Sequence, residues 1–316
     1  ISGLVISDSD MTGRTIGGVK VVANMQNVSK YILKNWVDEV FINMESRTEY
    51  PQELVDDLVE MGVVVHFNLY NIENVAGNRH AVERLGNYTV LTSSMNYATN
   101  KQAFAKRTMD IAGGIVGCIL TGIIFIFIAP VIYISSPGPI FFSQTRVGQN
   151  GRRFKIYKFR SMYMDAEERK KELMAQNRVK DGMMFKMDFD PRIIGNRILP
   201  DGTKKTGIGH FIRVTSLDEF PQFFNVLKGE MSLVGPRPER PYYVDKFKEE
   251  IPRYMIKHQV RPGITGWAQV NGYRGDTSIY KRIECDLYYI ENWTVLFDIK
   301  ILFFTVFKGF INKNAY

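Results

Sequence analysis

The sequence predicts an α/β domain at the N-terminus, followed by a mixed α+β domain that is held at a membrane. Three observations predict this arrangement. Strand-like and helix-like segments alternate up to about residue 100, an uncharged apolar run spans residues 111–134, and basic residues flank that run on both sides. A length of 316 residues suits about two domains, which we place at residues 1–100 and 101–316.

The balance of charges and cysteines limits the class of protein. Lys and Arg number 41 against 33 Asp and Glu, which gives a formal net charge of +8. Such a balance fits three kinds of partner: nucleic acid, an anionic membrane surface, or a phosphorylated small substrate. Charged residues at 23% and aromatic residues at 13% exclude a disordered chain. The two cysteines exclude a disulfide scaffold, because Cys118 lies inside the apolar run.

Short β-branched runs and amphipathic runs alternate in the first domain, which favours a mainly parallel sheet with helices between its strands. In the second helix Pro51 lies near the start and Gly62 is placed to cap the end. The glycine fingerprint of a dinucleotide site is absent, so we assign no nucleotide here. The sequence begins with Ile1 and not with Met, so we leave open that the natural N-terminus is missing; no secretory signal follows Ile1. The expected strands are Gly3–Ile6, Val19–Val22, Val40–Asn43, Val63–Phe67 and Thr89–Leu91, and the expected helices are Val28–Trp36 and Pro51–Met61.

The run at 111–134 carries no charge and, as a helix, is long enough to cross the roughly 30 Å hydrocarbon core of a bilayer. A buried core helix is the alternative, but the run has no polar stripe. Lys106 and Arg107 precede it and Arg146 follows it, so a single crossing would put one basic flank on the wrong side. Pro130 removes a helix hydrogen bond and kinks the axis. We therefore favour a bent, re-entrant helix over a true span.

Two more helices are expected in the second domain. The segment Asp165–Asn177 is highly charged and predicts a solvated helix, to which we attach no function. The segment Val295–Phe310 combines bulky apolar residues with spaced lysines. It suits either the core or a helix that lies in the membrane interface, and we keep both alternatives.

The segment from Arg213 to Gly229 predicts one amphipathic helix. Ser216 and Glu219 match a capping box, Asp218 is an acid in the first turn, and Gly229 fits the C-terminal stop. This pattern can be explained by helix stability alone. The apolar face consists of Leu217, Phe220, Phe223, Phe224 and Leu227.

The neighbours of Asp218 and Glu219 favour a functional interpretation. Adjacent carboxylates at a helix N-terminus stay ionised and can hold a divalent cation, and an ionised Asp aimed at phosphorus is a competent nucleophile. Arg213 stands close by in sequence, and Arg237 and Arg261 lie beside prolines that limit backbone freedom. Together these residues indicate a pyrophosphate site.

Several strings from about residue 104 to the C-terminus occur in an order that is typical of one family. They are Lys106-Arg107-x-x-Asp110, Gly138-Pro139-x-x-Phe142-x-Gln144-x-Arg146-x-Gly148, Phe154-Lys-Ile-Tyr-Lys158-Phe-Arg160-Ser-Met162, Ser216-Leu-Asp218-Glu219, Asn225-Val-Leu-Lys-Gly-Glu-Met-Ser-Leu-Val-Gly-Pro-Arg237-Pro238 and Val260-Arg261-Pro-Gly-Ile-Thr-Gly-Trp-Ala-Gln269-Val-Asn-Gly272. On these strings the sequence resembles the bacterial sugar transferases, also called monotopic phosphoglycosyl transferases.

The resemblance implies a reaction and a place in the cell. The reaction is transfer of a sugar 1-phosphate, with a hexose as the sugar, from a UDP-sugar to undecaprenyl phosphate with release of UMP. This is the first membrane step of capsule, exopolysaccharide or O-antigen assembly, at the cytoplasmic face of the bacterial inner membrane. The implied fold is a Rossmann-like α/β domain followed by a monotopic catalytic domain with a re-entrant helix. Nucleic acid is not an expected partner, and a homo-oligomer is left open.

The resemblance also implies roles for single residues. Asp218 would be the nucleophile that forms a covalent phospho-sugar intermediate and also touches Mg²⁺, with Glu219 as its partner. The family breaks its apolar helix at a Ser-Pro pair, which here is Ala129-Pro130, so the proline break is kept and the serine hydroxyl is lost. The positions expected to hold phosphates are Lys158, Arg213, Arg237 and Arg261.

Two other functions are kept as alternatives. The first is a direct glycosyltransferase that uses a carboxylate as a base and forms no covalent intermediate. The second is a nucleic-acid-binding or regulatory membrane protein without catalysis, which the charge alone would allow. The residues do not rank one UDP-sugar above another.

Overall fold

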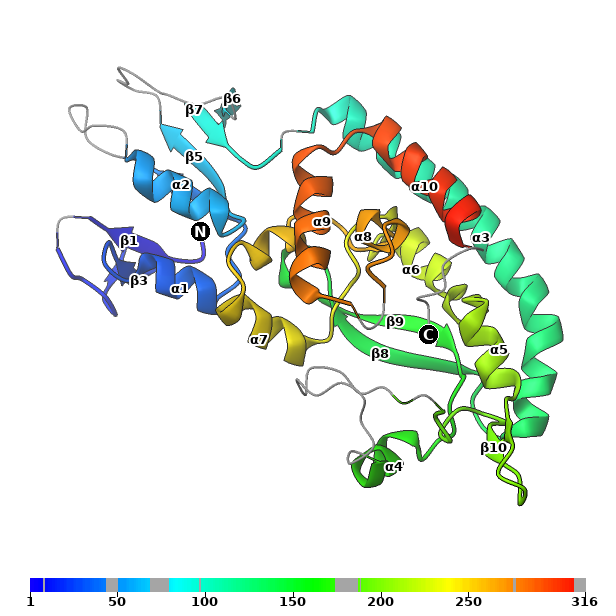
Figure 1. Ribbon diagram of the computed structural model, residues 1–316. Helices are drawn as coiled ribbons and strands as arrows, with labels where there is room; N and C mark the ends of the chain where they lie inside the picture. Colours follow the sequence, from blue (N-terminus) through cyan, green and yellow to red (C-terminus); the bar gives the residue numbers. More distant parts are fainter. Residues whose placement is uncertain are drawn as a thin grey trace. The chain divides into compact units, whose positions relative to one another are not determined.

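The computed structural model describes residues 1–7, 9–43, 51–68, 80–96, 98–173, 187, 189–274 and 277–309. The chain forms two compact units (Figure 1). Unit 1 comprises residues 1–97 together with 246–259, and unit 2 comprises 98–245 together with 260–316. A division into two folded domains at residue 100 stays a prediction.

Unit 1 contains two small sheets, with the strand orders β1-β3-β2 and β4-β5-β7-β6. One hydrophobic core joins residues of β3 and β5 to the buried faces of α1 and α2, with Val55, Leu58 and Val65 at its centre. The strands are β1 (Leu4–Ile6), β2 (Thr15–Ile16), β3 (Val19–Asn24), β4 (Glu39–Ile42), β5 (Val64–Asn68), β6 (His80–Leu85) and β7 (Tyr88–Ser93), and the helices are α1 (Val28–Lys34) and α2 (Gln52–Glu60).

Each predicted strand and helix of unit 1 is present, but the prediction of a mainly parallel sheet is wrong. Only β1–β3 and β4–β5 run parallel, whereas β2–β3, β5–β7 and β6–β7 run antiparallel. Gly86, with φ 61°, and Asn87 join β6 to β7 directly. A two-residue connection produces an antiparallel hairpin, because a parallel neighbour needs a crossover of a dozen or more residues. The predicted cap of α2 is confirmed by the φ of 85° at Gly62.

Residues 246–259 add a buried segment to unit 1. Tyr254 and Ile256 are 1% and 0% exposed. A Cβ atom at Gly62 would lie 3.1 Å from the backbone of Ile256, so the end of α2 packs closely on this segment. Trp36 meets His258 edge-on, with ring centroids 5.2 Å apart. A segment from late in the sequence therefore completes the packing of the early unit.

Unit 2 combines a long helix and several shorter helices with three two-stranded sheets, which gives a mixed α/β fold. Its elements are α3 (Asn100–Ser135), β8 (Phe141–Val147), β9 (Arg153–Phe159), α4 (Ala166–Leu173), β10 (Arg197–Ile198), β11 (Lys204–Lys205), α5 (Ile208–Val214), α6 (Gln222–Lys228), β12 (Ser232–Val234), β13 (Gly263–Thr265), α8 (Trp267–Val270), α9 (Ile279–Glu291) and α10 (Val295–Gly309), while α7 (Pro241–Glu250) runs from unit 2 into unit 1. Residues 174–177 of the predicted charged helix and Phe310 of the predicted last helix lie outside the described residues.

The apolar run predicted at 111–134 lies inside α3, a single helix of 36 residues. Of the helices in the described ranges, α3 alone is long and apolar enough to cross a membrane, with a mean hydropathy of 2.8 and only 22% of its most apolar window buried. Pro130 lies within it, and the helix continues to Ser135. Figure 1 shows that α3 bends along its length. The re-entrant course stays a prediction.

One face of α3 is built from small residues and packs on α6 and β12. A Cβ atom added at Gly117 would lie 2.1 Å from the ring of Phe223, and one at Gly114 would lie 2.7 Å from Leu227. These glycines let the helices approach closely. The other faces of α3 expose bulky apolar side chains, among them Ile119, Ile126, Phe127 and Ile134 at 60%, 67%, 71% and 81%.

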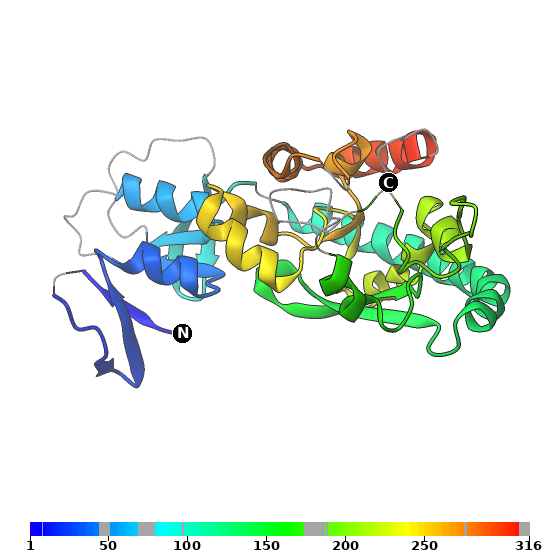
Figure 2. The ribbon, with the colours of Figure 1, turned by 60° about the horizontal axis from the view of Figure 1, so that its bottom comes forward.

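The β8–β9 hairpin carries Lys158 and lies on the opposite side of unit 2 from α10 (Figure 2). The hairpin is fixed to α6 by Asn225, whose side chain is fully buried. Its Oδ1 accepts a hydrogen bond from the backbone N–H of Tyr157 at 3.2 Å, and its Nδ2 donates to the carbonyl of Lys155 at 2.8 Å. One side-chain amide thus binds a backbone N–H and a backbone carbonyl of β9. These two bonds fix how β9 lies against α6, and therefore where Lys158 lies.

We expect Gly117→Ala to destabilise unit 2. The new methyl group would overlap the ring of Phe223, and overpacking of this kind costs about 1–3 kcal/mol. The matched control is Gly122→Ala on the same helix, where no atom lies within 4 Å of the added Cβ and where alanine should stabilise by roughly 0.5–1 kcal/mol. Free energies of unfolding measured in detergent compare the two variants. Equal stability would contradict the close packing of α3 on α6.

Candidate active site

Asp218 and Glu219 lie on a short 3-10 turn, Leu217–Glu219, that interrupts the helical path between α5 and α6. Ser216, directly before this turn, has a left-handed conformation with φ 57°, and its side chain makes no capping hydrogen bond. The prediction of one continuous helix with a capping box is therefore wrong. The reason is that Glu219 turns its carboxylate toward cations from elsewhere in unit 2, which form stronger bonds than a backbone N–H. Gly229, with φ 81°, ends α6 as predicted.

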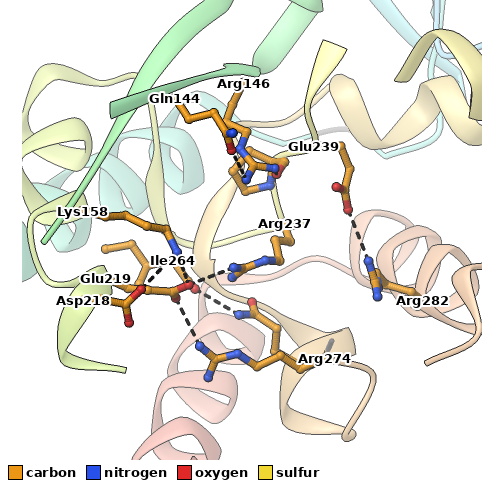
Figure 3. Close-up of polar contacts among 12 residues, drawn as sticks. Gln144, Arg146, Lys158, Asp218, Glu219, Arg237, Glu239, Ile264, Arg274 and Arg282 are labelled. Atoms are coloured by element: carbon orange, nitrogen blue, oxygen red, sulfur yellow. Dashed lines mark hydrogen bonds and ion pairs between the residues drawn. The ribbon is translucent and has the colours of Figure 1, made fainter. Parts of the chain in front are cut away.

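Three cations surround Glu219, which is only 7% exposed. Lys158 Nζ and Arg237 Nη2 each lie 2.8 Å from Oε1. Arg274 Nη2 lies 3.4 Å from Oε2. Figure 3 shows the three side chains converging on this carboxylate. They come from β9, from the loop after β12 and from the loop after α8, so tertiary folding builds the cluster.

Asp218 is as deeply buried as Glu219 but is held more loosely. Its Oδ2 lies 3.5 Å from Lys158 Nζ, and its Oδ1 has no hydrogen-bond or ion-pair partner among the described residues. Burial raises the pKa of Asp218, and the positive charge of Lys158 only partly opposes this. Burial would also raise the pKa of Glu219, but its three cations outweigh burial and hold that pKa well below its usual range. Glu219 is thus the firmly ionised acid, and Asp218 has an oxygen available to a ligand.

The loop that carries Arg237 follows β12 and is held on β13 by two backbone hydrogen bonds. The N–H of Gly235 donates to the carbonyl of Thr265 at 2.9 Å, and the N–H of Gly263 donates to the carbonyl of Pro236 at 2.9 Å. A Cβ atom at Gly235 would lie 2.4 Å from the carbonyl oxygen of Arg261, so glycine is required for this approach. The loops of Arg237 and Arg261 therefore pack against each other through their backbones.

Two more arginines hold the chain just after Arg237 (Figure 3). Arg146 Nη1 donates to the carbonyl of Pro238 at 3.3 Å, and Arg282 Nη1 lies 3.3 Å from Glu239 Oε1. Burial lowers the pKa of Arg146 to about 10, which leaves the guanidinium charged at neutral pH. The first contact holds the backbone at Pro238 and the second holds the side chain of Glu239, so the chain is fixed directly after Arg237.

The structure brings together Asp218, Glu219, Lys158 and Arg237 among the predicted site residues. Arg213, in the last turn of α5, lies near enough for its charge to lower the pKa of Asp218. Among the described residues, Arg261 forms no ion pair with either acid, although its loop packs on Gly235. Pro130 lies in α3 and is not part of the cluster. The roles assigned to these residues stay predictions.

Arg274 belongs to the cluster and was not predicted from the sequence. It lies just after the last matched string, in the segment Gly272-Tyr273-Arg274-Gly275. A lone arginine in a glycine-rich turn after α8 is a weak signal, because the same pattern occurs in many surface loops. Only the folded structure, which places Arg274 beside Glu219, distinguishes it from an arginine in such a surface loop.

The cluster has room for a metal ligand at Asp218 only. Among the described residues, no group of three or more His, Cys, Asp or Glu side chains could hold a metal ion. Mg²⁺, however, usually takes one or two protein carboxylates and completes its shell with water and substrate phosphate oxygens. Oδ1 of Asp218 fits one such ligand, whereas both oxygens of Glu219 are engaged by cations.

A family model described as "Bacterial sugar transferase" matches residues 101–312. The chain belongs to the bacterial sugar transferase family. It is 41% identical over 275 residues to the galactosyl transferase CpsE of Streptococcus agalactiae serotype III (strain NEM316). It is 44% identical over 215 residues to a UDP-glucose:undecaprenyl-phosphate glucose-1-phosphate transferase of Escherichia coli (strain K12). It is 44% identical over 206 residues to a UDP-N-acetylgalactosamine-undecaprenyl-phosphate N-acetylgalactosaminephosphotransferase of Aeromonas hydrophila.

The relatives of this sugar transferase differ in length. The three alignments cover 85%, 67% and 65% of this chain but 57%, 41% and 43% of the relatives, so the chain spans about half the length of the curated relatives it matches. A shorter relative, the uncharacterized sugar transferase EpsL of Bacillus subtilis (strain 168), is 38% identical over 209 residues, which are 66% of this chain and 89% of that protein. Every residue of the cluster around Glu219 lies inside the range that the family model matches.

We expect Arg274→Gln to lower stability at neutral pH but not at acidic pH. The folded-state pKa of Glu219 is depressed, so its ion pairs stabilise the protein above the ordinary pKa of 4.5, and this stabilisation is lost as the pH falls through the folded-state pKa. Removing one cation makes the depression smaller. The Tm of the variant should therefore lie below that of the wild type above pH 4.5, and the two should converge at lower pH.

The control is Arg197→Gln, which removes an exposed arginine from β10 in the same unit. Its Tm should follow the wild type throughout the pH series, measured by circular dichroism. If the gap between wild type and Arg274→Gln persists unchanged at acidic pH, Arg274 stabilises the fold through packing and not through the charge of Glu219.

Proposed function

We propose that this sugar transferase moves a hexose 1-phosphate from a UDP-sugar to undecaprenyl phosphate and releases UMP. The reaction would start capsule, exopolysaccharide or O-antigen assembly at the cytoplasmic face of the bacterial inner membrane. One observation carries the proposal: the available oxygen of Asp218 lies beside a carboxylate that gathers three cations. Two relatives are named as transferases that use a UDP-sugar and undecaprenyl phosphate, and their names support the same reaction here. The sugar is left unassigned, because these relatives carry the names of different sugars.

The chemistry proceeds by two displacements at one phosphorus atom. Oδ1 of Asp218 attacks the phosphorus that bears the sugar, the bond from that phosphorus to UMP breaks, and UMP leaves with the electron pair. The product is a phospho-sugar ester of Asp218. A phosphate oxygen of undecaprenyl phosphate then attacks the same phosphorus and releases the Asp218 carboxylate. Dividing the transfer in this way lets a single buried group serve both substrates in turn.

The cations reduce the repulsion between the reacting anions. Lys158, Arg237 and Arg274 carry three positive charges against the two carboxylates, which leaves a positive site for the diphosphate. Arg213 and Arg261 are proposed to add to this field. Because the acids are buried and the cations are partly buried, their interactions with a phosphate are stronger than they would be in water. Mg²⁺, when bound at Asp218, would supply further neutralisation of the phosphate oxygens.

The membrane anchor suits a lipid acceptor. α3 exposes a continuous apolar surface along most of its length, and its small-residue face packs on α6, directly after the turn that carries Asp218. An exposed apolar surface of this extent marks a contact with a membrane or with another protein, and we propose the membrane. The same packing would therefore hold the nucleophile close to the headgroup of undecaprenyl phosphate.

We expect Asp218→Asn to reduce UMP release by at least about 1,000-fold, as loss of a nucleophile does. Asparagine has nearly the same size as aspartate but cannot form the ester. The wild type incubated with a UDP-sugar carrying a β-phosphate label, without the lipid, should release one UMP per enzyme and retain the label on the protein. The control Asp201→Asn removes an exposed acid between β10 and β11 and should behave as the wild type does.

The label also separates the alternatives. It should appear in the lipid product if the sugar phosphate is transferred, and it should stay in UDP if the enzyme is a direct glycosyltransferase. Wild-type UMP release by Asp218→Asn would falsify the proposed nucleophile. A wild type that releases neither nucleotide but binds nucleic acid would support a regulatory protein instead.

The acid side of the pH–activity profile should report the raised pKa of Asp218. The nucleophile must be ionised, so kcat/KM should fall as the pH drops through that pKa. Lys158→Met removes a charge that lowers this pKa and should move the acid limb to higher pH. Glu219→Gln removes a charge that raises it and should move the limb to lower pH. Both variants will be slow, but the opposite directions of the two shifts are diagnostic. If the acid limb of the profile lies at the same pH in both variants as in the wild type, Asp218 is not the group whose ionisation controls it.

A further inference from the structure

A buried polar cluster lies behind the loop that carries Arg237. Its centre is Asp298 in the first turn of α10, which is 0% exposed. Its Oδ2 accepts from Lys106 Nζ at 2.6 Å and from Trp293 Nε1 at 3.2 Å, and its Oδ1 accepts from the hydroxyl of Tyr289 at 2.7 Å. Burial, with the negative charge of Asp298, raises the pKa of Tyr289 well above its usual range, so the phenol keeps the proton that it donates.

This cluster contacts one backbone atom in particular, the carbonyl oxygen of Val234. Lys106 Nζ donates to it at 2.9 Å, and the hydroxyl of Tyr289 lies 3.2 Å from it. Val234 is the last residue of β12, and Arg237 follows three residues later. The single proton of Tyr289 goes to the charged carboxylate, so the Lys106 ammonium is the cluster's main donor to Val234.

The same face of α10 reaches the neighbouring strand. Thr305, seven residues or two turns after Asp298, lies 2.8 Å from the hydroxyl of Thr265 in β13. Thr265 in turn accepts the N–H of Gly235 through its carbonyl. Through Lys106, Asp298 is linked to the end of β12, and Thr305 contacts β13 directly. The loop of Arg237 follows β12, and the loop of Arg261 precedes β13.

α10 buries an acid and exposes bulky apolar side chains. Its inner face holds Asp298 and Thr305 together with Ile301, which is 0% exposed, whereas its outer face exposes Leu296, Phe303 and Phe307 at 77%, 57% and 58%. A buried ion pair usually contributes less stability than apolar residues of similar volume would, because two charges must be desolvated. Stability alone therefore does not account for Asp298 and Lys106 at this position.

We propose that Asp298, acting through Lys106 and Tyr289, is a positioning residue that holds the Val234 carbonyl and thereby aims Arg237 at the phosphate. The proposal rests on the proposed function, because it treats Arg237 as a phosphate-binding group. Lys106 is the link: Asp298 fixes its ammonium, and the ammonium fixes the strand end. A displacement of about 1 Å at such a group costs roughly 100-fold in rate.

The test is a double-mutant cycle with Arg237, read out as kcat/KM for UMP release and as affinity for UDP by calorimetry. Asp298→Asn and Lys106→Met should each lower kcat/KM by about 10- to 100-fold. In an Arg237→Gln background the same changes should cost less than about threefold, because the aimed side chain is already gone. The control Lys300→Met removes an exposed lysine from the same helix as Asp298 and should stay close to the wild type.

A second variant separates positioning from mere stability. Lys106→Met combined with Asp298→Leu replaces the ion pair with apolar residues and should restore the Tm, even if Asp298→Asn alone folds poorly. The proposal expects the restored protein to keep the loss in kcat/KM and the weaker UDP affinity. Recovery of both, or a full additional loss in the Arg237→Gln background, would overturn it. Failure of the proposed function would show differently, as a wild type that releases no UMP.

Discussion

The burial of the Glu219 charge is the constraint on which the site depends. A carboxylate that is 7% exposed is tolerated only when cations replace the water that it loses. Lys158, Arg237 and Arg274 supply them from three separate segments. The carboxylate therefore cannot be buried until β9, the loop after β12 and the loop after α8 have come together. The same requirement leaves three cations converged beside Asp218, where the anionic substrate of the proposed function would need them.

The two neighbouring acids divide the work because they are solvated differently by the protein. Glu219 accepts bonds through both oxygens, which holds its pKa low. Asp218 is equally buried but has one distant contact at 3.5 Å, so its pKa rises. A carboxylate gripped by several cations is a poor nucleophile, since its electron pairs are already engaged. Concentrating the cations on Glu219 would therefore suit the role of nucleophile that we propose for Asp218.

Local patterns in the sequence were enough to place much of this structure. Glycines identified the ends of α2 and α6, an uncharged run identified α3, and motif strings identified the acids and two of their cations. The misses have two causes. Glu219 left the expected capping box for Lys158 and Arg237, so here long-range contacts prevail over local preference. The antiparallel pairing in unit 1 follows instead from a two-residue turn that joins β7 to β6, a strand that was not predicted. Arg274 could not be chosen, because only the folded loop brings it to Glu219.

α10 exposes apolar side chains on its outer face and buries Asp298 beside Ile301 on its inner face. A helix whose outer face is apolar and whose inner face holds a buried acid would be unfavourable in water on both faces. Contact of the outer face with lipid would remove the first cost, and the contacts of Asp298 with Lys106 and Tyr289 offset the second. α10 and α3 lie side by side (Figure 1) and expose apolar residues together. If the outer face of α10 lies in the membrane interface, one helix contacts both the bilayer and the strands that hold the Arg237 and Arg261 loops. On the proposed function one substrate comes from water and the other from lipid, and this arrangement would hold the phosphate-binding groups at a fixed depth.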